Sequence, residues 1–154
     1  MHRMSRIKVA SIVIAVGCAI AVAGSGAARA APVQMIVYRA GEKVPESELV
    51  DLGPPEGLGG IVLEGDPKIS ARIDYAAGNL LAGVFQATRG EVQIHFPFTE
   101  HATVIEGAVT LTDETGQTVR LGPGDSYLIQ QDSSILWRVM QSFVQKSFFN
   151  VVEE

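Results

Sequence analysis

The chain has 154 residues, of which 47% are hydrophobic, 19% charged and 6% aromatic, and its formal net charge is −5. This composition excludes a collagen-like, disordered or disulfide-stapled chain, because the apolar content is ordinary and there is one cysteine. Four of the twelve basic residues lie in the first thirty positions, so a chain without them would carry −9, a charge that repels nucleic acid and excludes it as an expected partner.

The first thirty residues predict a signal peptide. Basic residues up to Lys8 precede the apolar run Val9–Ala23, and Ala28-Arg29-Ala30 supplies the small-x-small pattern of a cleavage site. The apolar run is shorter than the roughly 20 residues that cross a bilayer as a helix. We therefore expect export to the periplasm or the medium, with no stable membrane association after cleavage. An uncleaved anchor is the alternative.

The rest of the chain is predicted to be all-β. Val33–Tyr38 forms a short apolar strand, and residues 40–60, rich in Glu, Pro and Gly, form a loop with a helical turn at Glu46–Leu49. Short runs of β-forming residues then alternate with turn residues about every 8–12 positions, which is typical of a sandwich or barrel. The expected strands are Gly60–Leu63, Lys68–Tyr75, Leu80–Thr88, Glu91–Phe96, Ala102–Glu106, Ala108–Asp113, Thr118–Leu121, Ser126–Ile129, Ile135–Met140 and Val144–Val152.

Three segments are expected along the chain. Residues 1–30 are the signal peptide, residues 31–62 an N-terminal strand and loop, and residues 63–154 one barrel domain. A closed or two-sheet barrel would remove the edges that so many short strands expose. The predicted strand Val33–Tyr38 leaves an unpaired edge, which favours a homodimer.

Two segments of the barrel resemble the motifs of the cupin superfamily. Phe98–Gly107, in which a Glu is followed seven residues later by a Gly, resembles the first motif, and Gly122–Ile129 resembles the start of the second. The hairpin Thr110–Gly116 and Trp137 are similar to small single-domain cupins of the group resembling (S)-ureidoglycine aminohydrolase. The resemblance covers about Leu63–Val152. It implies a cupin-type double-stranded β-helix, or jelly-roll barrel, with an open, ligand-sized interior.

The resemblance also implies candidate metal ligands, because metal-binding cupins use an H-x-H pair, a Glu and a later His. These positions fall on Gln93, His95, Glu100 and Ile135, and Ile135 cannot bind a metal. Gln93 and His95 share one strand face at i and i+2, which is expected to face the interior. With Glu100 they offer three donors for one divalent metal, such as Mn, Fe, Ni or Zn. The alternative is a metal-free barrel in which His95 and Glu100 form a buried pair.

Three aromatic residues are candidate ligand contacts. Trp137 occupies the position of the Trp in the cupin group, and Tyr127 and Phe85 lie close to the motifs in the sequence. Core packing is the alternative role for each of them. No Ser-His-Asp order, G-x-S-x-G, P-loop or C-x-x-C pattern follows the signal peptide, so the sequence identifies no catalytic residue.

Three functions follow as hypotheses. The first is an exported single-domain cupin that binds a small molecule in a barrel with a degenerate metal site. The second is a metal-assisted enzyme that acts on a small polar substrate by amidohydrolase-like C–N chemistry. The third is a structural or interaction protein with a filled barrel. The fold alone does not decide among them.

Overall fold

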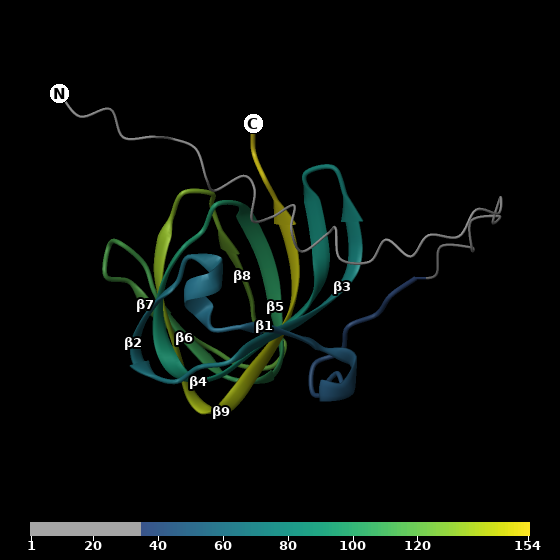
Figure 1. Cartoon of the computed structure of the whole chain (residues 1–154), viewed down its shortest axis with the longest axis horizontal. Coiled ribbons are helices and arrows are strands. Elements are labelled where there is room, and N and C mark those ends of the chain that lie inside the picture. Colours follow the sequence, from purple (N-terminus) through teal and green to yellow (C-terminus); the bar gives the residue numbers. More distant parts are fainter. Residues whose placement is uncertain (1–34) are drawn as a thin grey trace. The chain divides into compact units, whose positions relative to one another are not determined.

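A computed structural model describes residues 35–154 of the chain (Figure 1). The predicted signal peptide, its cleavage site and the start of the predicted strand Val33–Tyr38 lie outside the described residues. Residues Val37–Glu154 form one compact unit, to which the following description applies. Within residues 35–154, no helix is both long enough and apolar enough to cross a membrane.

The described part of the chain is built from strands with two short 3-10 turns, which confirms the predicted all-β class. The predicted helical turn is present, but residues 35–38 form no strand, because no neighbouring strand pairs with them. The homodimer prediction therefore no longer has the unpaired edge of that strand to support it, and it stays a prediction. The elements in chain order are η1 (Glu46–Glu48), β1 (Val50–Gly53), η2 (Pro55–Leu58), β2 (Ile61–Gly65), β3 (Ile69–Ala77), β4 (Leu80–His95), β5 (Thr99–Gly107), β6 (Val109–Thr112), β7 (Thr118–Leu121), β8 (Ser126–Ile129) and β9 (Ser134–Val151).

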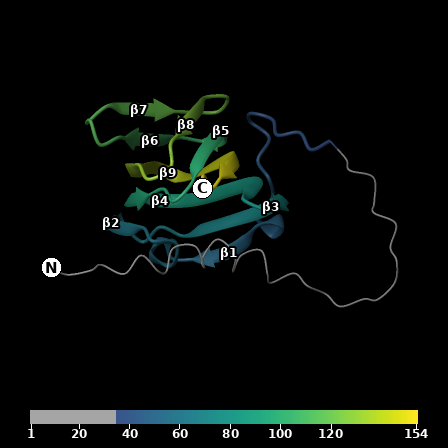
Figure 2. The ribbon, with the colours of Figure 1, turned by 90° about the horizontal axis from the view of Figure 1, so that it is seen from above.

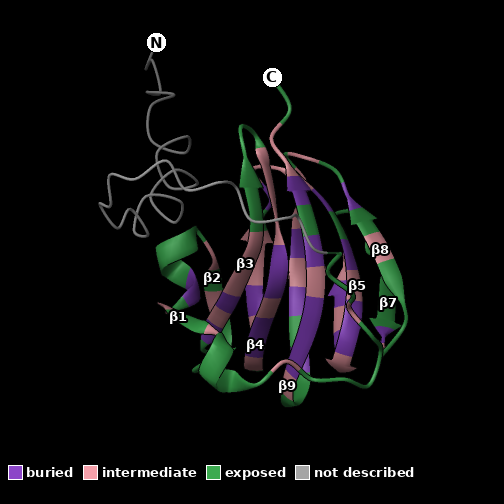
Figure 3. Ribbon diagram, turned by 90° about the vertical axis from the view of Figure 1, so that its right-hand side faces the viewer, coloured by how far each residue is buried: buried purple, intermediate pink, exposed green. Residues whose placement is uncertain are grey.

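The strands pair antiparallel in the order β1-β3-β4-β9-β5-β8, with β2 on β4 and β6 on both β9 and β7 (Figure 2). The long strands β4 and β9 therefore each have several partners: β4 pairs with β2, β3 and β9, and β9 pairs with β4, β5 and β6. Figure 3 shows the resulting buried stripe along β4, β9 and β5. The core cluster includes Val104, Val109, Trp137, Val139 and Val144, each at most 3% exposed.

A β-bulge in β4 determines which of its residues face the interior. Before the bulge, Phe85 is paired directly with Lys146 of β9. The register shifts between Thr88 and Gly90, and beyond it Val92 is paired with Trp137. Across this register shift the alternation of β4 reverses, so odd positions face inward before it and even positions face inward after it. Gly90 fits this site because a Cβ there would lie 2.9 Å from the backbone oxygen of Glu64.

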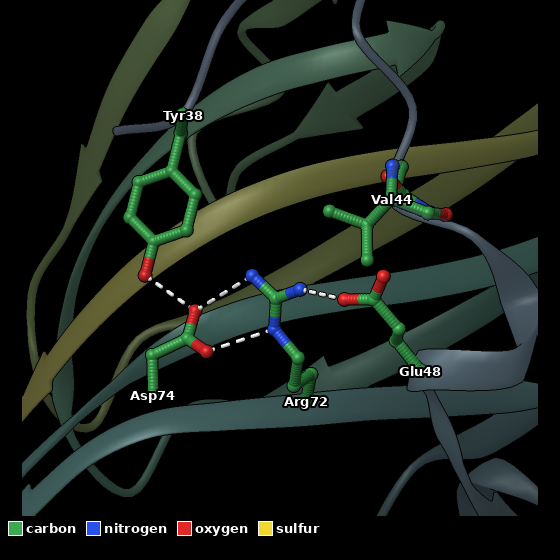
Figure 4. Close-up of polar contacts among 6 residues, drawn as sticks. Tyr38, Val44, Glu48, Arg72 and Asp74 are labelled. Atoms are coloured by element: carbon green, nitrogen blue, oxygen red, sulfur yellow. Dashed lines mark hydrogen bonds and ion pairs between the residues drawn. The ribbon is translucent and has the colours of Figure 1, made fainter. Parts of the chain in front are cut away.

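Residues 37–49, which we call the N-terminal strap, lie against the outer face of the sheet. The side-chain amide of Gln145, which is fully buried, accepts a hydrogen bond from the Val44 N–H at 2.7 Å and donates one to the Val44 carbonyl at 2.9 Å. Further contacts also hold the strap: Tyr38 donates to Asp74 at 2.7 Å, Glu48 pairs with Arg72 (Figure 4), and the Gly41 N–H donates to the Ile105 carbonyl at 2.7 Å. Burial, followed by the Asp74 carboxylate, raises the pKa of Tyr38.

Candidate functional site

Three polar side chains meet inside the barrel and form what we call the interior triad, Glu100, Tyr127 and Lys146. Strands β5, β8 and β9 each contribute one of them. The Lys146 ammonium contacts the Glu100 carboxylate, and the side chains are only 5% and 4% exposed, respectively. Tyr127 donates a hydrogen bond to Oε1 of Glu100 at 2.8 Å, and Nζ of Lys146 donates to the Tyr127 hydroxyl at 2.9 Å. All three groups are therefore hydrogen-bonded to one another.

Aromatic rings surround the Lys146 ammonium. Its Nζ lies 4.9 Å from the Trp137 ring centroid, 5.2 Å from that of Phe85 and 5.5 Å from that of Tyr127. The Trp137 ring meets the other two edge-on, with centroid distances of 6.5 Å to Phe85 and 6.3 Å to Tyr127. Such faces attract a cation through their quadrupoles. The structure thus brings the three predicted aromatic residues together around one amine.

Burial shifts the acid–base equilibria of the triad. Desolvation lowers the pKa of Lys146, and the neighbouring Glu100 carboxylate opposes that shift. Desolvation, and then the charge of Glu100, raise the pKa of Tyr127 well above its usual value. Chemically, the site holds an amine, a phenol and a carboxylate between which protons can move through direct hydrogen bonds.

Two buried polar atoms near the triad have no hydrogen-bond partner. They are Nε1 of Trp137, a donor, and Oδ1 of Asn150, an acceptor. Asn150 is paired directly with Glu100 across β9 and β5, and the Trp137 ring lies beside Lys146. Most buried polar atoms in proteins are paired, so two unpaired ones flanking a polar cluster suggest a site for another molecule.

The predicted metal ligands are not brought together. Glu100 lies in the interior, but the His95 side chain is 56% exposed, with Nε2 3.7 Å from Asp132 on the surface. Gln93 is paired with Leu136, one position along from the inward-facing pair of Val92 and Trp137. The expectation that Gln93 and His95 face inward is wrong, because beyond the bulge the even positions of β4 face inward and these two odd positions face outward.

The residues present do not fit a divalent metal. The interior offers one carboxylate, and its Oε1 already accepts hydrogen bonds from Lys146 and Tyr127. The ammonium supplies the positive charge that a metal would otherwise bring, and it would repel a second cation. Among residues 35–154, no group of three or more His, Cys, Asp or Glu side chains is arranged to hold a metal ion. We derive no chemistry through a metal.

Sequence reasoning missed Lys146 and Asn150, although a signal for both exists. In the predicted strand Val144–Val152, Lys146 and Asn150 are each two residues from the apolar Phe148, so all three side chains are expected on the same face of the strand. A polar residue at an inward-facing position of an apolar strand is a candidate for a buried site. The prediction relied instead on the cupin motif, which supplies Glu100 but neither of these two residues.

Two cavities lie outside the interior. One, of about 210 Å³, is bounded by η1, β1, β3 and β4 and includes Lys68 and Gln86. The other, of about 240 Å³, lies between β2, β4 and β9 and includes Arg89 and Arg138. Neither is lined by a residue of the interior triad or by an unpaired buried atom. The interior is therefore the stronger candidate site.

Comparison with known proteins gives one matching family model over part of the chain, together with a shared fold. Residues 75–148 match the model of the EutQ-like cupin domain, whereas no curated protein matches the chain. The structure of the Clostridium difficile EutQ protein is 18% identical, with a TM-score of 0.53, and the match covers 72% of this chain and 81% of that chain. A Pseudomonas syringae pv. tomato protein of unknown function is 24% identical, with a TM-score of 0.59, over 67% of this chain and 44% of that one. At such identities the solved structures show the jelly-roll fold alone.

Proposed function

We propose that this cupin-domain protein is an exported binding protein that holds a small, uncharged molecule against the interior triad. The observation that carries the proposal is the pair of unpaired buried atoms among residues 35–154, Trp137 Nε1 and Asn150 Oδ1. The Trp137 ring lies beside Lys146, and Asn150 is paired with Glu100 across the sheet. An unpaired buried polar atom costs roughly 1–3 kcal/mol. A ligand that offers both an acceptor and a donor would remove that cost.

The charge of the site favours an uncharged ligand. The interior carries one negative group, Glu100, and one positive group, Lys146, and they contact each other. The pair balances its own charge, so a charged ligand would be buried without a counter-ion, which is expensive inside a protein. The surrounding Phe85, Tyr127 and Trp137 rings suit the apolar part of such a ligand.

Entry to the site requires small movements at its border. Phe85 and Tyr127 are partly exposed side chains that pack against the buried core, and both rings lie within 5.5 Å of the Lys146 ammonium. Side-chain rotations of partly exposed residues are fast. A molecule of a few heavy atoms can therefore reach Lys146 and Trp137 when these side chains move apart.

Propionamide and propionate test the proposal as a pair of probes of equal size. Propionamide offers a carbonyl acceptor and N–H donors without charge, whereas propionate carries a negative charge. The chain has one tryptophan, so its fluorescence reports on the site directly. We expect a saturable fluorescence change with millimolar propionamide and none with propionate, because so small a ligand binds no tighter than the micromolar range.

Two variants complete this experiment, with binding followed by the NMR signals of propionamide. Trp137→Phe should abolish binding, because the indole N–H donor is lost. The variant keeps an aromatic side chain at this position. Phe149→Leu, on the exposed face of the same strand, should bind as the wild type does. Equal binding by Trp137→Phe, or no response to propionamide in the wild-type protein, would contradict the proposal.

Export is tested separately, on the sequence that supports it. We expect the mature protein to begin at Ala31, because Ala28-Arg29-Ala30 follows an apolar run too short to span a bilayer. Mass spectrometry of protein from cell fractions of its native host measures the N-terminus and the location together. An intact Met1 in the cytoplasmic fraction would contradict export and leave the binding proposal unaffected.

A further inference from the structure

Lys146 is placed as a nucleophile as well as an ion-pair partner. Its amine is buried in the interior, and the centroids of three aromatic rings lie within 5.5 Å of Nζ. The rings limit what can approach Nζ to small molecules with apolar substituents. A lysine desolvated in an apolar pocket is a recurrent nucleophile toward carbonyl carbon.

Imine formation requires one group that takes a proton from the amine and one that returns protons to the carbonyl oxygen, and the partners of Lys146 can do both. Glu100 contacts the ammonium directly and can take its proton, and Tyr127 bonds both groups. The amine must lose a proton to attack, and the oxygen of the carbonyl must later gain protons to leave as water. Positioned acid and base groups speed such transfers by about 10²–10⁴-fold.

We propose, building on the binding function above, that Lys146 captures small aldehydes or ketones as a reversible imine. The ammonium passes a proton to Glu100, and the nitrogen lone pair forms a bond to the carbonyl carbon while the C=O π pair moves to oxygen. That oxygen gains protons from Glu100 and from the nitrogen, with Tyr127 relaying between them, and leaves as water. The nitrogen lone pair then completes the C=N bond. The ammonium and the carbonyl thus give a protonated imine and water, Glu100 is again a carboxylate, and no oxidant or reductant is consumed.

Two other lysines follow the predicted signal peptide and provide an internal comparison. Lys43 and Lys68 lie on the surface, with side chains 35% and 58% exposed, and each pairs with an acidic side chain. Neither contacts a tyrosine hydroxyl in the hydrogen bonds of the described residues. The rate at which they are labelled gives the reactivity of surface lysines of the same protein under the same conditions.

Reductive trapping with propanal tests the inference. The full-length protein is incubated with limiting propanal and cyanoborohydride, which reduces an imine to a stable propyl-lysine, and peptides are then mapped by mass spectrometry. We expect Lys146 to be labelled about 100-fold faster than Lys43 or Lys68, the lower end of the acceleration that positioned acid–base groups give. Labelling of Lys146 no faster than that of the surface lysines would overturn the inference.

Tyr127→Phe separates a reactive site from a merely buried lysine. The variant keeps the ring and removes only the hydroxyl, so labelling of Lys146 should slow about 100-fold. Tyr75→Phe changes an exposed tyrosine and should leave the rate unchanged. Unchanged labelling in Tyr127→Phe would refute the role given to the phenol.

The amide probe distinguishes the two proposals. Propionamide cannot form an imine under these conditions, so its binding tests the site without testing the chemistry. Binding of propionamide without preferential labelling of Lys146 would refute imine capture and leave the binding function standing. Protection of Lys146 from propanal by propionamide would support both.

Discussion

Lys146→Met is expected to lower the free energy of unfolding by about 3–5 kcal/mol, because it leaves the Glu100 carboxylate buried without a counter-ion. Both side chains of the pair are almost completely buried, so water cannot replace the lost ammonium. Denaturant unfolding followed by circular dichroism measures the change. An exposed pair gives the matched control: Lys68→Met, which breaks the contact with Asp66, should cost less than about 1 kcal/mol.

Removing the charge of Glu100 as well tests whether the lost stability comes from the Glu100–Lys146 ion pair. Glu100→Gln added to Lys146→Met leaves no charged group of the pair in the interior, so much of the stability should return, with a coupling energy of about 2–3 kcal/mol. Additive losses in the double variant would show that the two residues act independently. Elemental analysis of the same proteins adds a separate check: bound divalent metal that disappears in Glu100→Gln would support the metal hypothesis instead.

Gln145→Leu is expected to cost about 2–3 kcal/mol and to release the N-terminal strap. The amide of Gln145 makes three hydrogen bonds, two to the backbone of Val44 and one to Gln86, and leucine can make none of them. Each buried group left unpaired costs roughly 1–3 kcal/mol, and opening of the strap to water limits the total. Hydrogen exchange should show loss of protection at the Val44 amide.

Gln141→Leu is the control for this variant. It makes the same substitution in β9, at an exposed position, so stability should change by less than about 0.5 kcal/mol. Protection of the Val44 amide should match that of the wild type. If Gln145→Leu kept the strap protected, the contacts of Tyr38 and Arg72 would be sufficient to hold it, and the role assigned to Gln145 would be wrong.

Local signals made much of the fold predictable from the sequence. The strands Thr118–Leu121 and Ser126–Ile129 have the predicted bounds, and the glycine- and proline-containing turn Gly122–Asp125 separates them clearly. The breaks predicted within β4 and β9 are absent. Gly90 resembles a turn residue in the sequence, yet it forms a bulge inside a continuous strand. A bulge and a turn share their local composition, and only pairing with β9 distinguishes them.

The site was predictable only in part, because strand pairing, which the local sequence does not reveal, also decides which side chains meet in the interior. The motif supplied Glu100, and the aromatic candidates Phe85, Tyr127 and Trp137 do meet, around the Lys146 ammonium that pairs with it. The inward direction of His95 was taken from the metal-ligand positions of the cupin motif, whereas the pairing of β4 with β9 places His95 on the outer face. Which amine lies beside Glu100 depends on the pairing between β5 and β9, which brings together Glu100 and Lys146, 46 residues apart in the chain.

The position of β9 also constrains how the sheet assembles. Residues Ser134–Val151 pair with β4, β5 and β6, all of which precede them in the chain. Until β9 is available, the backbone groups of three strands stay open on one side, and open strand edges are templates for association with other chains. Closing such distant pairs is entropically slow, so folding is expected in the millisecond-to-second range of proteins dominated by non-local contacts. The nascent chain thus passes through a period in which aggregation competes with the arrival of a single strand.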